Sequence, residues 1–118
     1  MNLTTKHLLL FVFSIGFLSI MAQPTMAPAG LSASYKKYAN RIELSWKATA
    51  AQDKYIVHRR ERQQKAFTPI DTIAQNRYVD RNKLRASTEY IYCVQALDPQ
   101  GMASAFSTEA TGALLIIA

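Results

Sequence analysis

The feature of this 118-residue sequence that most constrains its fold is an alternation of apolar and polar residues at every second position. Ile42, Leu44 and Trp46 form one such run, with polar residues between and beside them. A longer run covers residues 89–97. A period of two residues is that of a β-strand with one buried face. Because no useful window beyond the N-terminal segment has a helical period, the sequence predicts an all-β domain.

Seven short segments separated by turns carry strand patterns, and they cover residues 31–35, 42–47, 55–57, 67–74, 78–79, 89–97 and about 104–115. Pro69 places the fourth segment at a sheet edge, because proline cannot donate a ladder hydrogen bond. Residues 98–101 have the Asp, Pro and Gly positions of a type I turn. Together these segments favour a seven-strand antiparallel sandwich of two sheets, which is an immunoglobulin-like architecture. The side chains expected in its core are Leu31, Leu44, Trp46, Tyr55, Val57, Leu84, Tyr90, Tyr92 and Val94.

Residues 1–22 are typical of a secretory signal peptide. Lys6 precedes an apolar run over residues 8–21, which is shorter than the roughly 20 residues of a membrane span. Cleavage is expected after Ala22 or, alternatively, after Ala27, and an uncleaved membrane anchor is the other interpretation. Cleavage after Ala22 would leave residues 23–29 as a short tether and residues 30–118 as one domain without a membrane span. We therefore expect a secreted or extracytoplasmic protein, in the periplasm or cell envelope if the source is bacterial.

Charge and cysteine content limit the possible partners and the sources of stability. The whole chain has a net charge of +6, and loss of Lys6 with the signal would leave +5. A charge of this size, spread over a small domain, more often reflects solubility than a dedicated nucleic-acid site. Export also argues against nucleic acid as a partner. Cys93 is the only cysteine, so the fold must be held by its core, or by a partner as well.

Cys93 and His58 are the only residues that suggest catalysis. Both face outward by strand parity, on segments that we expect to be neighbours. A cysteine nucleophile needs a lowered pKa and an oriented base, and a zinc site needs three or four ligands. The other histidine, His7, would leave with the signal. We therefore predict no catalytic residue, no cofactor and no metal site.

The same outer face is the candidate interaction surface, because exposed apolar patches tend to mark contacts with other proteins. An alternative is that long Arg and Lys stems of the chain itself cover it. The basic residues 58–65 form either a solvated strand end and loop or a docking site for an acidic polymer or a lipid headgroup. The apolar residues 113–118 extend the last strand, offer a strand to a partner, or mark the truncation of a longer protein. The candidate interaction surface on the outer face consists of Ile56, His58, Arg60, Arg62, Ile91, Cys93 and Gln95.

Several motifs in order resemble those of one family. Trp46 ends the second strand pattern, and Leu84 stands six residues before Tyr90, the spacing of a tyrosine corner. Tyr78 and Asp80 form a Tyr-x-Asp element. Over about residues 28–114 the chain resembles a fibronectin type III domain of the kind found in bacterial secreted and surface proteins. The resemblance implies that the Tyr90 phenol bonds to backbone just upstream, whereas the family's Arg-Gly-Asp adhesion motif is absent from residues 99–102.

The resemblance implies a function without catalysis, as an extracytoplasmic protein-interaction or spacer module. The expected partner is another envelope or secreted protein. The alternative is a carbohydrate or cell-wall binding module that uses its loops and the basic residues 58–65, with a polysaccharide as its ligand.

Overall fold

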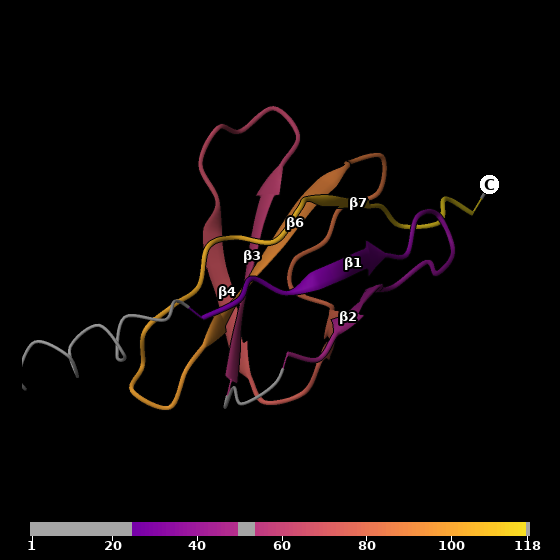
Figure 1. Cartoon of the computed structure of the whole chain (residues 1–118). Coiled ribbons are helices and arrows are strands. Elements are labelled where there is room, and N and C mark those ends of the chain that lie inside the picture. Colours follow the sequence, from indigo (N-terminus) through magenta and orange to yellow (C-terminus); the bar gives the residue numbers. More distant parts are fainter. Residues whose placement is uncertain (1–24, 50–53, 118) are drawn as a thin grey trace, which may run out of the picture.

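The computed structural model describes residues 25–49 and 54–117, which form two antiparallel sheets packed face to face (Figure 1). The first sheet has the strand order β1 (Ala29–Ala33), β2 (Ile42–Lys47), β5 (Arg77–Asp80). The second has the order β4 (Thr68–Ile73), β3 (Lys54–Glu61), β6 (Tyr90–Leu97), β7 (Ala110–Gly112). The expected signal peptide, its cleavage after Ala22 and the start of the tether lie outside the described residues. Within the described residues, no helix is long and apolar enough to cross a membrane.

Seven strands in two sheets agree with the predicted architecture, but three strand ends differ from the prediction. β1 begins at Ala29 and ends at Ala33, so residue 35 lies beyond it. β3 continues to Glu61, into the polar stretch 58–65 that was expected to be a strand end followed by a loop. The last strand, predicted over about residues 104–115, is a regular strand only at Ala110–Gly112.

Two serines explain why the last strand is short. Ser104 and Ser107 donate their backbone N–H groups to the carbonyls of Ala96 and Val94, at 2.8 and 2.9 Å. Their hydroxyls also accept the N–H groups of the same two residues, each at 2.9 Å. The step of three residues from Ser104 to Ser107 therefore lies alongside a step of only two residues in β6, from Ala96 to Val94. The segment follows β6 through side-chain bonds, and no regular ladder forms there.

The turn after β6 has the predicted form. The Gly101 N–H donates to the Asp98 carbonyl at 2.9 Å, which closes the four-residue turn. The Asp98 carboxylate also accepts the N–H groups of Gln100 and Met102, at 2.9 and 2.8 Å. The turn thus satisfies its own backbone donors.

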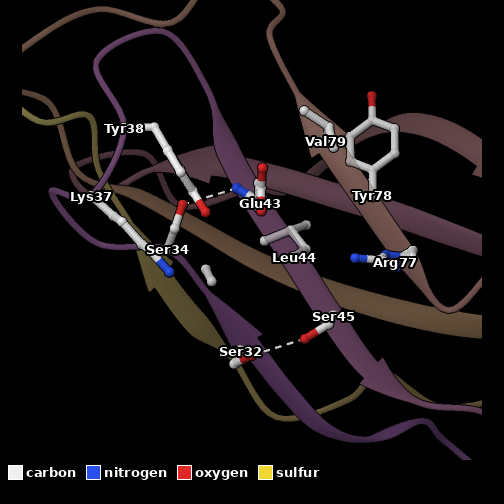
Figure 2. A pocket seen from close by; sticks show the side chains of 11 residues that line it. Ser32, Ser34, Lys37, Tyr38, Glu43, Leu44, Ser45, Arg77, Tyr78 and Val79 are labelled. Atoms are coloured by element: carbon white, nitrogen blue, oxygen red, sulfur yellow. Dashed lines mark hydrogen bonds between the residues drawn. The ribbon is translucent and has the colours of Figure 1, made fainter.

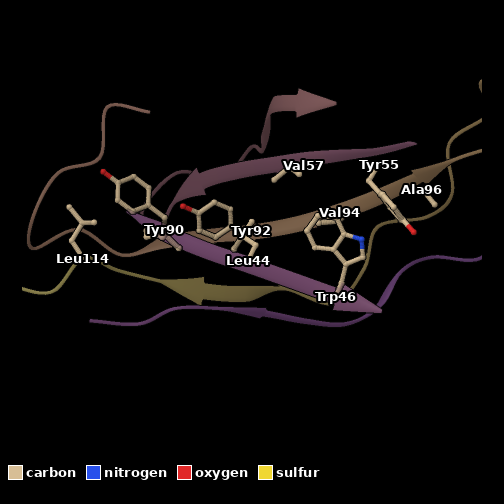
Figure 3. Close-up of a cluster of buried hydrophobic side chains, with 10 residues drawn as sticks. Leu44, Trp46, Tyr55, Val57, Tyr90, Tyr92, Val94, Ala96 and Leu114 are labelled. Atoms are coloured by element: carbon tan, nitrogen blue, oxygen red, sulfur yellow. The ribbon is translucent and has the colours of Figure 1, made fainter. Parts of the chain in front are cut away.

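The core fills the space between the sheets and contains no disulfide, since Cys93 is a free thiol. Figure 3 shows Trp46 of β2 beside Tyr55 of β3, and their rings meet edge to face with centroids 5.3 Å apart. Leu31 and Leu84 are half-buried and pack against this cluster. Large aromatic side chains supply the buried area that a disulfide would otherwise supplement. The buried members of the cluster are Ile42, Leu44, Trp46, Tyr55, Val57, Tyr90, Tyr92, Val94, Ala96 and Leu114.

Two polar contacts hold the sandwich together. The Tyr90 hydroxyl accepts the Arg85 backbone N–H at 2.7 Å, which is the upstream bond implied by the tyrosine-corner spacing. The second contact is centred on Asp80 of β5, whose side chain is fully buried. Its carboxylate accepts Tyr92 Oη of β6 at 2.6 Å and Arg59 Nη1 of β3 at 2.9 Å. Asp80 therefore links the two sheets, a role that the sequence did not predict.

Candidate functional site

The predicted interaction surface on β3 and β6 is not an exposed patch. His58 lies opposite Cys93 in the strand register, so these two residues are neighbours as expected. However, Ile91, Cys93 and His58 are only 3%, 1% and 8% exposed, and the expectation of an open apolar face is wrong for them. Strand parity gave the correct face but could not show what covers it. Ile56, Arg60 and Gln95 are half-buried, and Arg62 is exposed.

Aromatic residues from neighbouring segments cover part of this face. The ring of Phe106, which lies between β6 and β7, meets His58 edge-on with centroids 4.9 Å apart. Phe67 stacks on Phe106 at 6.2 Å, and the Arg60 guanidinium lies 5.1 Å from the Phe67 ring centroid. The cover is therefore partly aromatic and partly an arginine stem, which is the alternative predicted from the sequence.

The environment of Cys93 does not suit nucleophilic chemistry. Burial, with the nearby Glu109 carboxylate, raises the pKa of the thiol to about 11. The thiol therefore stays protonated near neutral pH, whereas a nucleophilic cysteine needs a lowered pKa. His58 Nε2 lies 2.8 Å from Gln95 Oε1. Among residues 25–49 and 54–117, no group of three His, Cys, Asp or Glu side chains is arranged to hold a metal ion.

The basic residues 58–65 do not form an open row of positive charge. The three arginines of this segment each lie within 4 Å of a carboxylate. Two of these contacts are close hydrogen-bonded ion pairs, and the third spans 3.6 Å. The charge available to an acidic polymer is correspondingly reduced. The pairs are Arg59 with Asp80, Arg60 with Glu109, and Arg62 with Glu89.

An open pocket of about 380 Å³ lies at the end of the sandwich where β6 begins, and we call it the end pocket. Three segments form it: residues 35–36, residues 87–89, and residues 113–116 of the C-terminal segment. The C-terminal segment is fixed by backbone bonds. Lys36 N–H donates to the Ala113 carbonyl at 2.8 Å, and Leu115 N–H donates to the Tyr38 carbonyl at 2.8 Å.

The rim of the end pocket is polar and already hydrogen-bonded. The Tyr35 phenol donates to the Glu89 carboxylate at 2.5 Å, and the Arg62 guanidinium donates to the same carboxylate. The Tyr35 hydrogen bond, followed by that of Arg62, lowers the pKa of Glu89 below its ordinary value. Glu89 in turn raises the pKa of Tyr35. The rim therefore holds a fixed negative charge between two donors.

Unusual backbone conformations and exposed apolar side chains coincide at the end pocket. Lys36 and Ser87 line it, with φ angles of 55° and 63° in the left-handed region. Such conformations in residues other than glycine are uncommon and gather at ligand-binding sites. Tyr35 and Ile116 of the lining are 46% and 52% exposed, and the following residue, Ile117, is 73% exposed. The apolar C-terminal segment is thus bonded along its backbone, while these side chains face solvent.

The fold is that of an immunoglobulin-like module, because two antiparallel sheets stack face to face and the Tyr90 hydroxyl bonds to backbone upstream of it. The sequence model of the Fibronectin type III domain matches residues 26–112, and the chain belongs to that family. Domains of this family are typically non-catalytic and commonly mediate protein–protein interactions. No curated protein matches the sequence.

Solved structures agree with this family assignment. The chain is similar to an Fn3-like protein from Clostridium thermocellum at 28% identity and a TM-score of 0.69, covering 81% of this chain and 99% of that one. It is also similar to part of a β-1,2-glucanase from Parabacteroides distasonis, with 20% identity, a TM-score of 0.69, and coverage of 81% and 13%. Domains A168–A170 of titin match at 22% identity and a TM-score of 0.65, with coverage of 75% and 31%. The last two show a shared fold alone.

Proposed function

We propose that this chain is a non-enzymatic, extracytoplasmic protein-interaction module that binds its partner at the end pocket. One observation carries the proposal: the exposed Tyr35 and Ile116 both line a pocket whose rim is already hydrogen-bonded. The extracytoplasmic location rests on the sequence of residues 1–22, which is typical of a secretory signal.

The chemistry of the end pocket indicates what it would bind. Ala113, Leu114 and Ile116 give it an apolar side that suits an apolar side chain of a partner. Glu89 on the rim accepts hydrogen bonds and favours a backbone N–H or a basic group beside that side chain. An apolar anchor with a polar rim is the usual composition of a protein interface. The partner is therefore a secreted or envelope protein that presents a protruding apolar residue.

Carbohydrate binding through residues 58–65 is the alternative function. Its support is weaker, since the arginines of that segment lie close to carboxylates. A pure spacer role is a further alternative, and it would make no use of the end pocket. A crosslinking experiment at the end pocket distinguishes protein binding there from both alternatives.

The experiment places a photo-crosslinking amino acid at Ile116 in the full chain, expressed in the cells from which the sequence comes. A matched chain carries it at Met102, which is 66% exposed in the turn at the other end of β6. We expect one discrete protein adduct from position 116 and none from position 102. Adding Tyr35→Ser should lower that adduct at least about tenfold, the effect of losing roughly 1.4 kcal/mol.

Three results would contradict the proposal. Equal adducts from both positions, or an adduct that Tyr35→Ser leaves unchanged, would show that the end pocket does not select the partner. The absence of any adduct would also contradict it, in favour of the carbohydrate or the spacer alternative.

In the same cells, N-terminal sequencing tests the location, and we expect the exported chain to begin at Gln23 after cleavage at Ala22. A retained Met1 would contradict export by a cleaved signal.

A further inference from the structure

The outer face of the three-stranded sheet has an open hollow of about 510 Å³ (Figure 2). Its floor carries the short side chains of Ser32, Ser34 and Ser45, and we call it the serine hollow. Longer side chains stand at its two ends, with Lys37 and Tyr38 at one end and Arg77 and Val79 at the other in Figure 2. The strand register explains this, because Ser45 of β2 lies between Ser32 of β1 and Arg77 of β5.

The floor of the serine hollow offers several hydroxyls with bonding capacity left. Ser32 Oγ and Ser45 Oγ lie 3.2 Å apart, so each pairs with the other and keeps further lone pairs. Ser34 Oγ accepts the Glu43 backbone N–H at 2.9 Å, and this hydroxyl can still donate its proton. A ligand with several hydroxyl groups would match this floor.

Glu43 supplies a fixed acceptor at the edge of the serine hollow. Arg41 Nε donates to its carboxylate at 2.7 Å, and the Arg41 guanidinium lies 3.7 Å from the centroid of the Tyr38 ring. The Arg41 hydrogen bond lowers the pKa of Glu43, so the carboxylate is ionised near neutral pH. A ligand here must therefore donate hydrogen bonds to Glu43.

Lys37 and Arg77 provide positive charge and form no ion pair within the described part of the chain. Within residues 25–49 and 54–117, neither side chain lies within 4 Å of a carboxylate, whereas five other arginines do. Charged groups that line a binding site commonly form charge-assisted hydrogen bonds with an oppositely charged group of the ligand. This pair of cations indicates a ligand that also carries an acid group.

We propose that the serine hollow binds an acidic sugar, a hexuronate unit whose carboxylate pairs with Arg77 while its ring hydroxyls bond the serines and Glu43. A polyacidic peptide would pair with the cations but has no ring hydroxyls to bond the serines and Glu43. A neutral sugar would leave both cations without a partner. The hollow has the size of a small-molecule site, about 300–1,000 Å³. It shares no lining residue with the end pocket, so it is a second and separate site.

Titration of the folded domain with trigalacturonate, followed by amide chemical shifts, tests the proposal. We expect shifts at Ser32, Ser34 and Ser45, and at least about tenfold weaker binding for Arg77→Gln, the effect of losing a charge-assisted bond. Ser45→Phe fills the hollow without a change in charge and should weaken binding as strongly. Arg62→Gln is the matched control, because it removes one exposed arginine outside the hollow. Tyr35→Ser, which disrupts the end pocket, should leave uronate binding unchanged.

The other titrants decide the ligand class. Maltotriose should bind at least about tenfold more weakly than trigalacturonate, since it lacks the acid group. A tri-glutamate peptide should also bind more weakly, because it lacks the ring hydroxyls. Equal binding of the peptide would overturn the sugar proposal in favour of an acidic peptide. Equal loss of binding in Arg77→Gln and Arg62→Gln would overturn it in favour of general charge attraction.

Discussion

Replacing Asp80 tests whether a buried carboxylate holds the two sheets together. Asp80 is fully buried on β5 and accepts Arg59 Nη1 at 2.9 Å, Tyr92 Oη at 2.6 Å and the Asn82 N–H at 3.0 Å. Asp80→Ala removes all of these acceptors at once. The Arg59 charge and the Tyr92 hydroxyl then lie in the interior without their partner.

The expected loss of stability follows from these contacts. Removing one member of a buried ion pair costs about 3–5 kcal/mol. Arg59 is 17% exposed and also donates to the Asn82 carbonyl, so we expect the lower part of that range. Tyr92→Phe removes a single hydrogen bond to a charged acceptor, and it should cost about 1.5–3 kcal/mol.

Urea unfolding followed by the fluorescence of Trp46, the only tryptophan, measures both losses. The double variant Asp80→Ala/Tyr92→Phe should lose at least about 1 kcal/mol less than the sum of the single variants, because the two side chains share one bond. A loss below about 1 kcal/mol for Asp80→Ala would refute the structural role of the carboxylate. Strict additivity would show that Tyr92 and Asp80 do not interact.

Three further predictions concern stability and reactivity. Gly112→Ala should cost about 1–3 kcal/mol in urea unfolding, because a Cβ there would lie 2.6 Å from Ile42 Cγ2; an unchanged midpoint would contradict this packing. Tyr90→Phe should cost about 1–2 kcal/mol of unfolding free energy, because the Arg85 N–H loses its acceptor. Thermal unfolding measures this loss, and an unchanged Tm would show that the bond is absent. Cys93 has a folded-state pKa of about 11, against about 8.5 in an unfolded chain, so its stabilising contribution is present below about pH 8.5 and is lost as the pH rises towards 11. Iodoacetamide should therefore modify Cys93 rapidly in urea and slowly in the native protein, and rapid native modification at neutral pH would show an accessible thiolate.

The strands were predictable where one face is buried and the other is not. Ile42, Leu44 and Trp46 alternate because β2 has one face on the core, and the spacing of Leu84 and Tyr90 indicated the corner bond. Such patterns depend on neighbours close in sequence, so a single chain is enough to reveal them.

Burial by distant segments could not be predicted in this way. Parity placed Cys93 and His58 on the outer face, but it does not tell that Phe106 lies over His58. Asp80 is buried because Arg59 and Tyr92, from two other strands, satisfy it. The Tyr-x-Asp element marked Asp80 as part of a family pattern, but it gave no signal for this link between the sheets.

The two candidate sites differ in the signal they left in the sequence. The end pocket depends on left-handed backbone at Lys36 and Ser87, and neither residue type indicates such a conformation. The serine hollow did have a signal, since Ser32 and Ser34 alternate along the first predicted strand and Ser45 of β2 lies opposite Ser32. A polar face of unusually short side chains is a pattern that strand parity can detect.

The most direct test of the end pocket as a protein-binding site is an affinity measurement with the protein that crosslinks at position 116. Calorimetry with purified partner compares the unaltered domain with Ile116→Ser and with Met102→Ser, two substitutions of exposed apolar residues at opposite ends of β6. We predict that Ile116→Ser weakens binding at least about tenfold and that Met102→Ser leaves the Kd unchanged. Equal affinity for all three proteins would contradict the account.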